Sequence, residues 1–139
     1  MSQPLTKNIT AAKNATTSKT ILLAEDDRSV RSYIARSLQS AGYTVLEAVD
    51  GADAVRVSRD YREEIHLLLT DVIMPKINGK QAYLDIAASR PHIKVLYMSG
   101  YAEDIILHRG ELELGTVLLQ KPFSNTDLLG MTLTALESK

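Results

Sequence analysis

Residues 67–75 read LLLTDVIMP, an apolar run that carries one acid, Asp71, and stops at a proline. The run is too short and too uniformly apolar for an amphipathic helix, and the turn residues Asn78 and Gly79 follow it. These features predict a strand buried on both faces, as strands of parallel sheets are. Ligands of open parallel α/β sheets bind beyond the carboxyl ends of the strands, where Asp71 falls. Taken alone, Asp71 favours a simpler interpretation, in which it only caps a turn.

The composition limits the class of protein. A chain of 139 residues with a formal net charge of −1 fits one domain, and it argues against nucleic acid or anionic membrane as the main partner. The absence of cysteine excludes disulfides, thiolate nucleophiles and zinc–thiolate sites. We find no signal peptide and no apolar run of membrane-spanning length, so we expect a cytoplasmic protein without membrane contact.

The chain divides into an arm and one folded domain. Residues 1–19 are polar and aperiodic, which predicts a flexible arm or linker. In residues 20–139, apolar strand-like and helix-like segments alternate. The predicted strands cover 20–24, 43–48, the Asp71 run, 93–98 and 116–119. The five predicted helices begin near Arg28, Asp50, Asn78, Ala102 and Ser124, and the fourth is short and weak. This alternation predicts an α/β fold with a doubly wound parallel sheet.

Polar residues follow four of these strands at their carboxyl ends. They are Glu25-Asp26-Asp27, Asp71, Ser99-Gly100 and Lys121. Because these ends meet at one edge of the sheet, the carboxylates would repel one another, by about 4 kcal/mol per pair at ~4 Å. Oxygen ligands without cysteine favour a hard dication there, magnesium before calcium. A carboxylate, a dication, a hydroxyl and an ammonium group together form a site for a phosphoryl group, with Asp71 as the nucleophile.

Four motifs, in this order and spacing, resemble the receiver domains of two-component response regulators. They are ILLAEDD at 21–27, LTDVIMP at 69–75 followed by Asn78-Gly79, YMSG at 97–100 and KPF at 121–123. The resemblance covers about residues 20–137 and implies a flavodoxin-like fold with strand order 2-1-3-4-5. It also implies that Asp71 accepts a phosphoryl group from a histidine kinase or a phosphotransfer domain. Partner binding would then change on the face built from helix four, strand five and helix five.

The resemblance also assigns the metal ligands. Glu25 and Asp26 would form the acidic pair of a Mg2+ site, with Asp26 the more direct ligand. Asp71 and the carbonyl oxygen of Ile73 would complete the protein ligands. For Asp27 we favour a different role, as a residue that starts the first helix.

Further residues would contact the phosphoryl group. Lys121 would pair with it, the Ser99 hydroxyl would move toward it, and the amides of Val72 and Gly100 would meet its oxygens. The resemblance implies a cis peptide between Lys121 and Pro122, which is otherwise an uncommon state.

Two positions depart from the commonest pattern of the family. Ser99 stands where threonine is frequent, which is a tolerated change. Leu118 stands where many members have an aromatic ring that turns inward on phosphorylation, so a switch by ring rotation is in doubt. Tyr101 is equally well read as a cover of the site or as a surface tyrosine. By resemblance, Ile73 and Tyr101 would flank the phosphoryl group. Neither carries an amide or a carboxylate to orient an attacking water, so we expect slow self-dephosphorylation and no other enzymatic activity.

The partner surface and the parent protein are expectations of the same kind. By resemblance, the kinase would dock on the flank of the first helix that carries Arg28, Arg31 and Ser32. The chain ends after its last helix without an output domain. It would therefore be a stand-alone receiver or the receiver of a hybrid sensor kinase.

Three other functions fit the sequence less well. A phosphohydrolase with an aspartyl nucleophile, of the haloacid-dehalogenase type, needs a second carboxylate two residues after the nucleophile, where this chain has Ile73. A flavin-binding flavodoxin needs a phosphate-binding loop after its first strand, whereas Glu25, Asp26 and Asp27 would repel a phosphate. A phosphate-independent interaction module is disfavoured because the set of charged residues is complete.

Overall fold

The computed structural model describes residues 18–100 and 116–138. Its strands are β1 (Thr20–Ala24), β2 (Thr44–Ala48), β3 (Leu67–Asp71), β4 (Lys94–Ser99) and β5 (Leu118–Gln120). Its helices are α2 (Arg28–Ser40), α3 (Gly51–Asp60), α4 (Gly79–Ser89) and α6 (Asn125–Glu137). The described residues thus contain four helices where five were predicted for the whole chain. The remaining predicted helix, 102–108, lies outside the described residues, as do Tyr101 and nearly all of the predicted arm.

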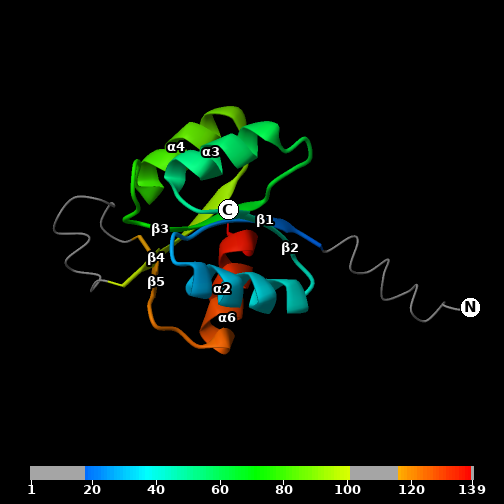
Figure 1. Cartoon of the computed structure of the whole chain (residues 1–139). Helices are drawn as coiled ribbons and strands as arrows, with labels where there is room; N and C mark the ends of the chain where they lie inside the picture. Colours follow the sequence, from blue (N-terminus) through cyan, green and yellow to red (C-terminus); the bar gives the residue numbers. More distant parts are fainter. Residues whose placement is uncertain (1–17, 101–115, 139) are drawn as a thin grey trace, which may run out of the picture.

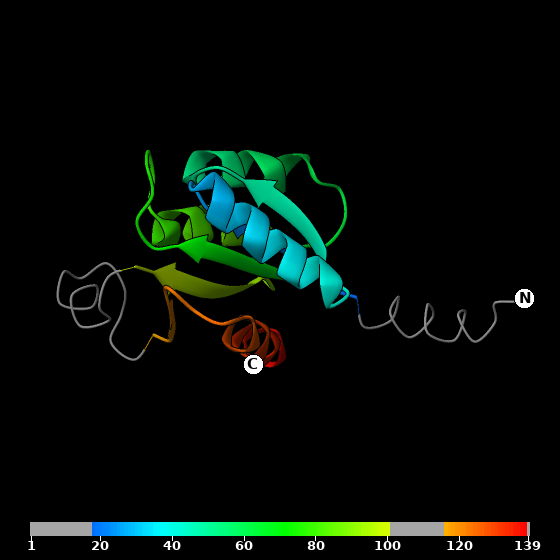
Figure 2. The same cartoon turned by 60° about the horizontal axis from the view of Figure 1, so that its bottom comes forward.

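The strands form one parallel sheet in the order β2-β1-β3-β4-β5, which confirms the predicted flavodoxin-like order. Helices α3 and α4 cover one face of the sheet, and α2 and α6 cover the other (Figure 1). The tilted view in Figure 2 brings α2 to the front, where it lies across the strands. Both faces of the central strands are therefore covered, as the apolar run at residues 67–75 requires.

Strand β3 is buried along its whole length because its side chains alternate between two cores. Leu67 and Leu69 pack beneath α2 and α6, in a cluster that includes Ile34. Leu68 points to the opposite face and packs in a second cluster with Ile86 of α4. Burying a leucine side chain contributes about 1.5–3 kcal/mol, so this strand is a rigid support for the residue at its end.

The residue just before each described helix has a side chain that accepts a hydrogen bond from the backbone N–H three residues later. The predicted caps Asp50, Asn78 and Ser124 are confirmed, with distances of 2.7, 2.9 and 3.0 Å. Asp27 caps α2 through the N–H of Val30 at 3.0 Å, which confirms its role at a helix start. Such a cap satisfies a donor that the helix leaves unpaired.

Strand β3 ends at Asp71, which confirms the predicted place of this acid at the end of the strand. The chain turns back there, because the N–H of Gly79 donates to the Val72 carbonyl oxygen at 2.7 Å. A Cβ atom at Gly79 would lie 2.1 Å from the carbonyl oxygen of Asp71, so only glycine permits this approach. The turn leaves Asp71 as the last residue of the strand, at the carboxyl edge of the sheet.

Candidate functional site

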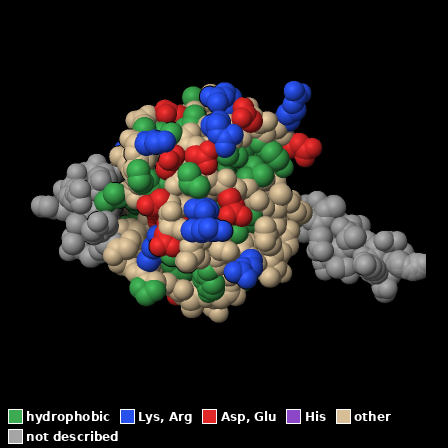
Figure 3. Space-filling view, in the orientation of Figure 1, with side chains coloured by type: hydrophobic (Ala, Val, Ile, Leu, Met, Phe, Trp, Pro, Cys, Tyr) green, Lys and Arg blue, Asp and Glu red, His purple; other side chains and the backbone are tan. Residues whose placement is uncertain are grey.

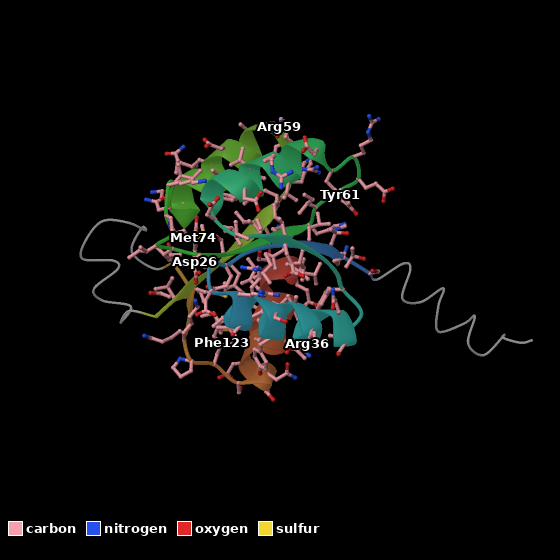
Figure 4. All side chains as sticks on the ribbon, in the orientation of Figure 1. Asp26, Arg36, Arg59, Tyr61, Met74 and Phe123 are labelled. Carbon is pink, nitrogen blue, oxygen red and sulfur yellow. The ribbon has the colours of Figure 1, made fainter. Side chains whose placement is uncertain are left out.

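Asp71 lies at the edge of the sheet but is not exposed, since only 5% of its surface is accessible. It pairs in register with Met98 of β4, and the next residue of that strand, Ser99, is also buried. Figure 4 labels Asp26 in the loop after β1, and a carboxylate oxygen of Asp26 lies within 4.8 Å of one from Asp71 at the end of β3. The structure therefore brings the ends of β1, β3 and β4 together, as the sequence predicted.

Lys121 binds two of the acids directly. Its Nζ atom lies 2.7 Å from Oδ1 of Asp71 and 2.5 Å from Oε1 of Glu25. The backbone N–H of Lys121 donates to the Ser99 carbonyl oxygen at 2.8 Å, which fixes the lysine beside the end of β4. The peptide between Lys121 and Pro122 is cis, as expected. A short ion pair to two carboxylates makes Lys121 the internal counter-ion of this site.

The three acids at this edge form a compact group. Glu25, Asp26 and Asp71 each place a carboxylate oxygen within 4.8 Å of the others. Glu25 is buried and uses its second oxygen, Oε2, to accept the Asp27 N–H at 2.9 Å, whereas Asp26 is exposed. When all three acids are ionised and Lys121 is protonated, the four side chains together carry a net charge of −2. Oxygen-only donors with this net charge match a hard dication such as Mg2+.

Burial controls the protonation of the central acid. Desolvation raises the pKa of Asp71 from 3.8 to about 7, and the nearby Glu25 carboxylate adds to the rise, while Lys121 opposes it. Burial would lower the pKa of Lys121, but its hydrogen bonds to Asp71 and Glu25 outweigh burial and raise that pKa. Lys121 alone therefore does not compensate the charge of Asp71, and a further cation would stabilise the ionised carboxylate.

The two backbone amides that were predicted to bind phosphate, those of Val72 and Gly100, have different surroundings in this conformation. The amide of Val72 donates to the Met98 carbonyl oxygen at 2.9 Å, one residue beyond the end of β3. It could meet a phosphate oxygen only if that bond opened. Gly100, in contrast, is exposed immediately after Ser99.

Leu118 has an aromatic neighbour, but the ring comes from another strand. Leu118 pairs in register with Tyr97 of β4, and both pack against Val72 and Ile73. Tyr97 is buried, and its burial raises the pKa of its hydroxyl, with a further contribution from Tyr83. The sequence signal for this ring was its place two residues before Ser99, on the same face of the strand.

Arg31 differs from its expected place on an exposed flank. Only 15% of its side chain is accessible, and its Nη1 atom donates to the Glu25 carbonyl oxygen at 2.8 Å. Arg28 is exposed, as predicted, and Ser32 is partly so. The expectation that Arg31 is exposed is therefore wrong, because the acidic loop after β1 binds its guanidinium group, while docking of a kinase on this flank stays a prediction.

The fold and the site together describe a doubly wound α/β domain with a group of three acids and one lysine at the carboxyl edge of its sheet. The chain matches the family described as "Response regulator receiver domain" over residues 21–132. The chain belongs to this family. Receiver domains of two-component systems are phosphorylated on aspartate, and they are signalling domains, not conventional enzymes.

Similar proteins agree with this assignment. The chain is 34% identical to the sensor kinase CckA of Brucella abortus over 96% of its own length, which is 14% of that kinase. It is 33% identical to the response regulator receiver protein CpdR of the same organism, covering 80% of this chain and 91% of CpdR. The solved receiver domain of the hybrid histidine kinase CckA is 34% identical, with a TM-score of 0.71 over 85% of this chain and 99% of that domain. In the described part of the chain, no helix has the length and apolar character needed to cross a membrane.

Proposed function

We propose that Asp71 accepts a phosphoryl group from the phosphohistidine of a histidine kinase or a phosphotransfer domain. The observation that supports this assignment is the short contact of Lys121 with Asp71, inside a group of three acids at the end of a buried strand. This arrangement supports a role for Asp71 as nucleophile, for Lys121 as the monovalent cation and for the acids as ligands of a dication.

In the proposed step, a carboxylate oxygen of Asp71 attacks phosphorus. The bond between phosphorus and the histidine nitrogen breaks, and its electron pair stays on the imidazole. Asp26, Asp71 and the carbonyl oxygen of Ile73 would hold Mg2+, with Glu25 close by, and the ion would supply positive charge to the phosphoryl oxygens. Lys121 would exchange its contact with Asp71 for a contact with the phosphoryl group, and it would keep its contact with Glu25.

The proposed switch begins at Ser99. Its hydroxyl would move toward the new phosphoryl group, near the amide of Gly100, and the shift would reach β5, α6 and the predicted helix that precedes β5 in the sequence. Ser99 pairs in register with Gln120 of β5, whereas Leu118, which has no ring, pairs with Tyr97 two residues earlier and packs in the same cluster. Rotation of a ring at position 118 is therefore not part of the mechanism, and Tyr101 remains a candidate cover of the site.

We infer that the phosphodonor docks beside α2. A groove with mostly apolar lining runs between this helix and the segment after β5, and it is lined by Val30, Tyr33 and Phe123 next to Lys121. Figure 3 shows positive and negative side chains interspersed over one face of the molecule, without one large basic patch. Such a surface suits a protein partner better than nucleic acid.

The parent protein can be of two kinds. The chain spans 14% of CckA, a sensor kinase, and 91% of CpdR, a response regulator receiver protein. We therefore keep both proposals, a receiver within a hybrid kinase and a stand-alone receiver, with residues 1–19 as an arm or linker before the domain. Because phosphohistidine is made from ATP, we place the domain in the cytoplasm.

Intact-mass spectrometry after incubation with acetyl phosphate and MgCl2 tests the proposal. We expect the parent protein to gain one phosphoryl group and to lose it again slowly, because Ile73 offers no group to orient water. Asp71→Asn should gain nothing, and EDTA should abolish the gain in the parent. Asp85→Asn, which alters an exposed acid of α4, is the matched control and should react like the parent. Equal gain in Asp71→Asn, or loss of the phosphate within seconds, would contradict the proposal.

A further inference from the structure

Arg31 connects helix α2 to the loop after β1 and to strand β2. It lies in α2, and its Nη1 atom donates to the Glu25 carbonyl oxygen at 2.8 Å. Its Nε atom lies 3.4 Å from Oε1 of Glu47 on β2. Glu47 pairs in register with Leu23 of β1, whose side chain packs beneath α2, so Glu47 faces the same side. The guanidinium group thus binds the loop after β1 on one side and the edge strand on the other.

Arg31 binds the peptide group that links Glu25 to Asp26. The Glu25 N–H donates to the Ala48 carbonyl oxygen at 3.1 Å, and the Glu25 carboxylate binds Lys121 and the Asp27 N–H. The Glu25 carbonyl oxygen is bound by Arg31. Because a peptide group is planar, fixing this carbonyl fixes the direction in which the chain continues to the Cα atom of Asp26.

Asp26 depends on this restraint more than its neighbours do. Its side chain is exposed, whereas Glu25 and Asp71 are buried and bound by Lys121. An exposed carboxylate stays within 4.8 Å of two others, despite their repulsion, only if its backbone is held. The bond from Arg31 is charge-assisted, which is the stronger class of hydrogen bond.

We propose that Arg31 is a positioning residue of the metal site, and that Glu47 holds its guanidinium group in place. The inference rests on the proposed function in that the acidic group is taken to bind Mg2+. It goes further, because it includes a residue of α2 and a residue of β2 that bind no metal. Groups that orient the ligands of a metal commonly affect its affinity by tenfold or more.

The sign of the effect separates positioning from simple electrostatics. Removing a positive charge near a cation site would, by Coulomb's law alone, tighten cation binding. Loss of a positioning bond would weaken it. A role in stability alone would lower the melting temperature and leave the affinity of the folded domain unchanged. A role of Arg31 in docking a kinase would not affect Mg2+ binding by the isolated domain.

The experiment is a MgCl2 titration followed by ¹H–¹⁵N correlation spectra, which read the amides of Asp26 and Asp71 without any phosphodonor. We expect Arg31→Met, which keeps the apolar stem, to raise the Kd for Mg2+ by on the order of tenfold. Glu47→Gln should raise the Kd by less than about fivefold, because this carboxylate is half exposed. The double variant should bind no more weakly than Arg31→Met, because Glu47 acts through Arg31. Arg36→Met is the matched control on the same helix and should bind like the parent, since Arg36 is exposed and its side chain bonds Ser32.

The outcomes separate the two proposals. Unchanged or tighter Mg2+ binding by folded Arg31→Met, beside a parent that binds, would overturn the positioning role alone. Absence of any Mg2+ response in the parent would overturn the metal site and this inference together. Circular dichroism establishes that each variant is folded. If Arg31→Met does not fold, the test rests on Glu47→Gln. This variant must then bind Mg2+ more weakly than the parent for the inference to stand.

Discussion

At pH 8 and without magnesium, Asp71→Asn should make the domain more stable toward urea. Burial raises the pKa of Asp71 from 3.8 to about 7, so the folded state holds this proton more tightly than the unfolded chain does. The stability that this proton contributes is fully present below pH 4 and is lost as the pH rises through 7. The difference of about three pKa units corresponds to at most about 4 kcal/mol. Asparagine carries no charge, and Lys121 keeps its contact with Glu25 in the variant.

Urea unfolding at pH 5 and pH 8 with EDTA, followed by far-UV circular dichroism, measures this effect. We expect Asp71→Asn to exceed the parent by about 2–4 kcal/mol at pH 8, and by less than half as much, at most about 1.7 kcal/mol, at pH 5, where the unfolded carboxyl group has already lost its proton. Asp85→Asn, at an exposed acid, should show no such dependence on pH. Added MgCl2 should stabilise the parent more than Asp71→Asn, because a ligand stabilises the state that binds it.

Two results would refute this reasoning. One is an Asp71→Asn variant that is no more stable than the parent at pH 8. The other is a gain in stability that is equal at both pH values, because such a gain would come from packing and not from charge.

Three further substitutions test other parts of the structure. Lys121→Met removes the cation that binds Glu25 and Asp71, and it should slow phosphoryl uptake from acetyl phosphate on the order of a hundredfold, as measured by intact mass. Thr132→Val should raise the free energy of unfolding by about 1 kcal/mol in urea, because the buried Thr132 hydroxyl has no hydrogen-bond partner among the described residues. A loss of stability would contradict this. Gly79→Ala should lower the free energy of unfolding by about 3 kcal/mol, because the new Cβ would lie 2.1 Å from the Asp71 carbonyl oxygen; an unchanged urea midpoint would show that the turn can relax.

The sequence predicted the fold because its signals are local and agree with one another. The apolar run before Asp71 matches a buried strand, and residues such as Asp50, Asn78 and Ser124 cap helices where the apolar spacing begins. Once the strands are known to be parallel, their carboxyl ends must share an edge, which brings Asp71 and Lys121 together. The predicted acidic group followed from the same rule.

The direction of individual side chains could not be predicted in this way. Arg31 was placed on the exposed flank of its helix, but the length of an arginine lets the guanidinium group turn back to the Glu25 carbonyl oxygen. The hydrogen bond from the Val72 amide to the Met98 carbonyl oxygen depends on the path of the chain just after β3, which the sequence pattern does not show. The contact between Leu118 and Tyr97 depends on the register of two strands, which one sequence does not reveal.

The most direct test of the central claim is to locate the phosphoryl group itself. The protein is incubated with acetyl phosphate and MgCl2 and then treated with sodium borohydride, which reduces an acyl phosphate to an alcohol. It is then digested and sequenced by tandem mass spectrometry. We predict that the residue converted to homoserine is Asp71, and that no conversion occurs with EDTA. Conversion at another carboxylate, such as Asp26, or no conversion in a protein that has gained a phosphoryl group, would contradict the account.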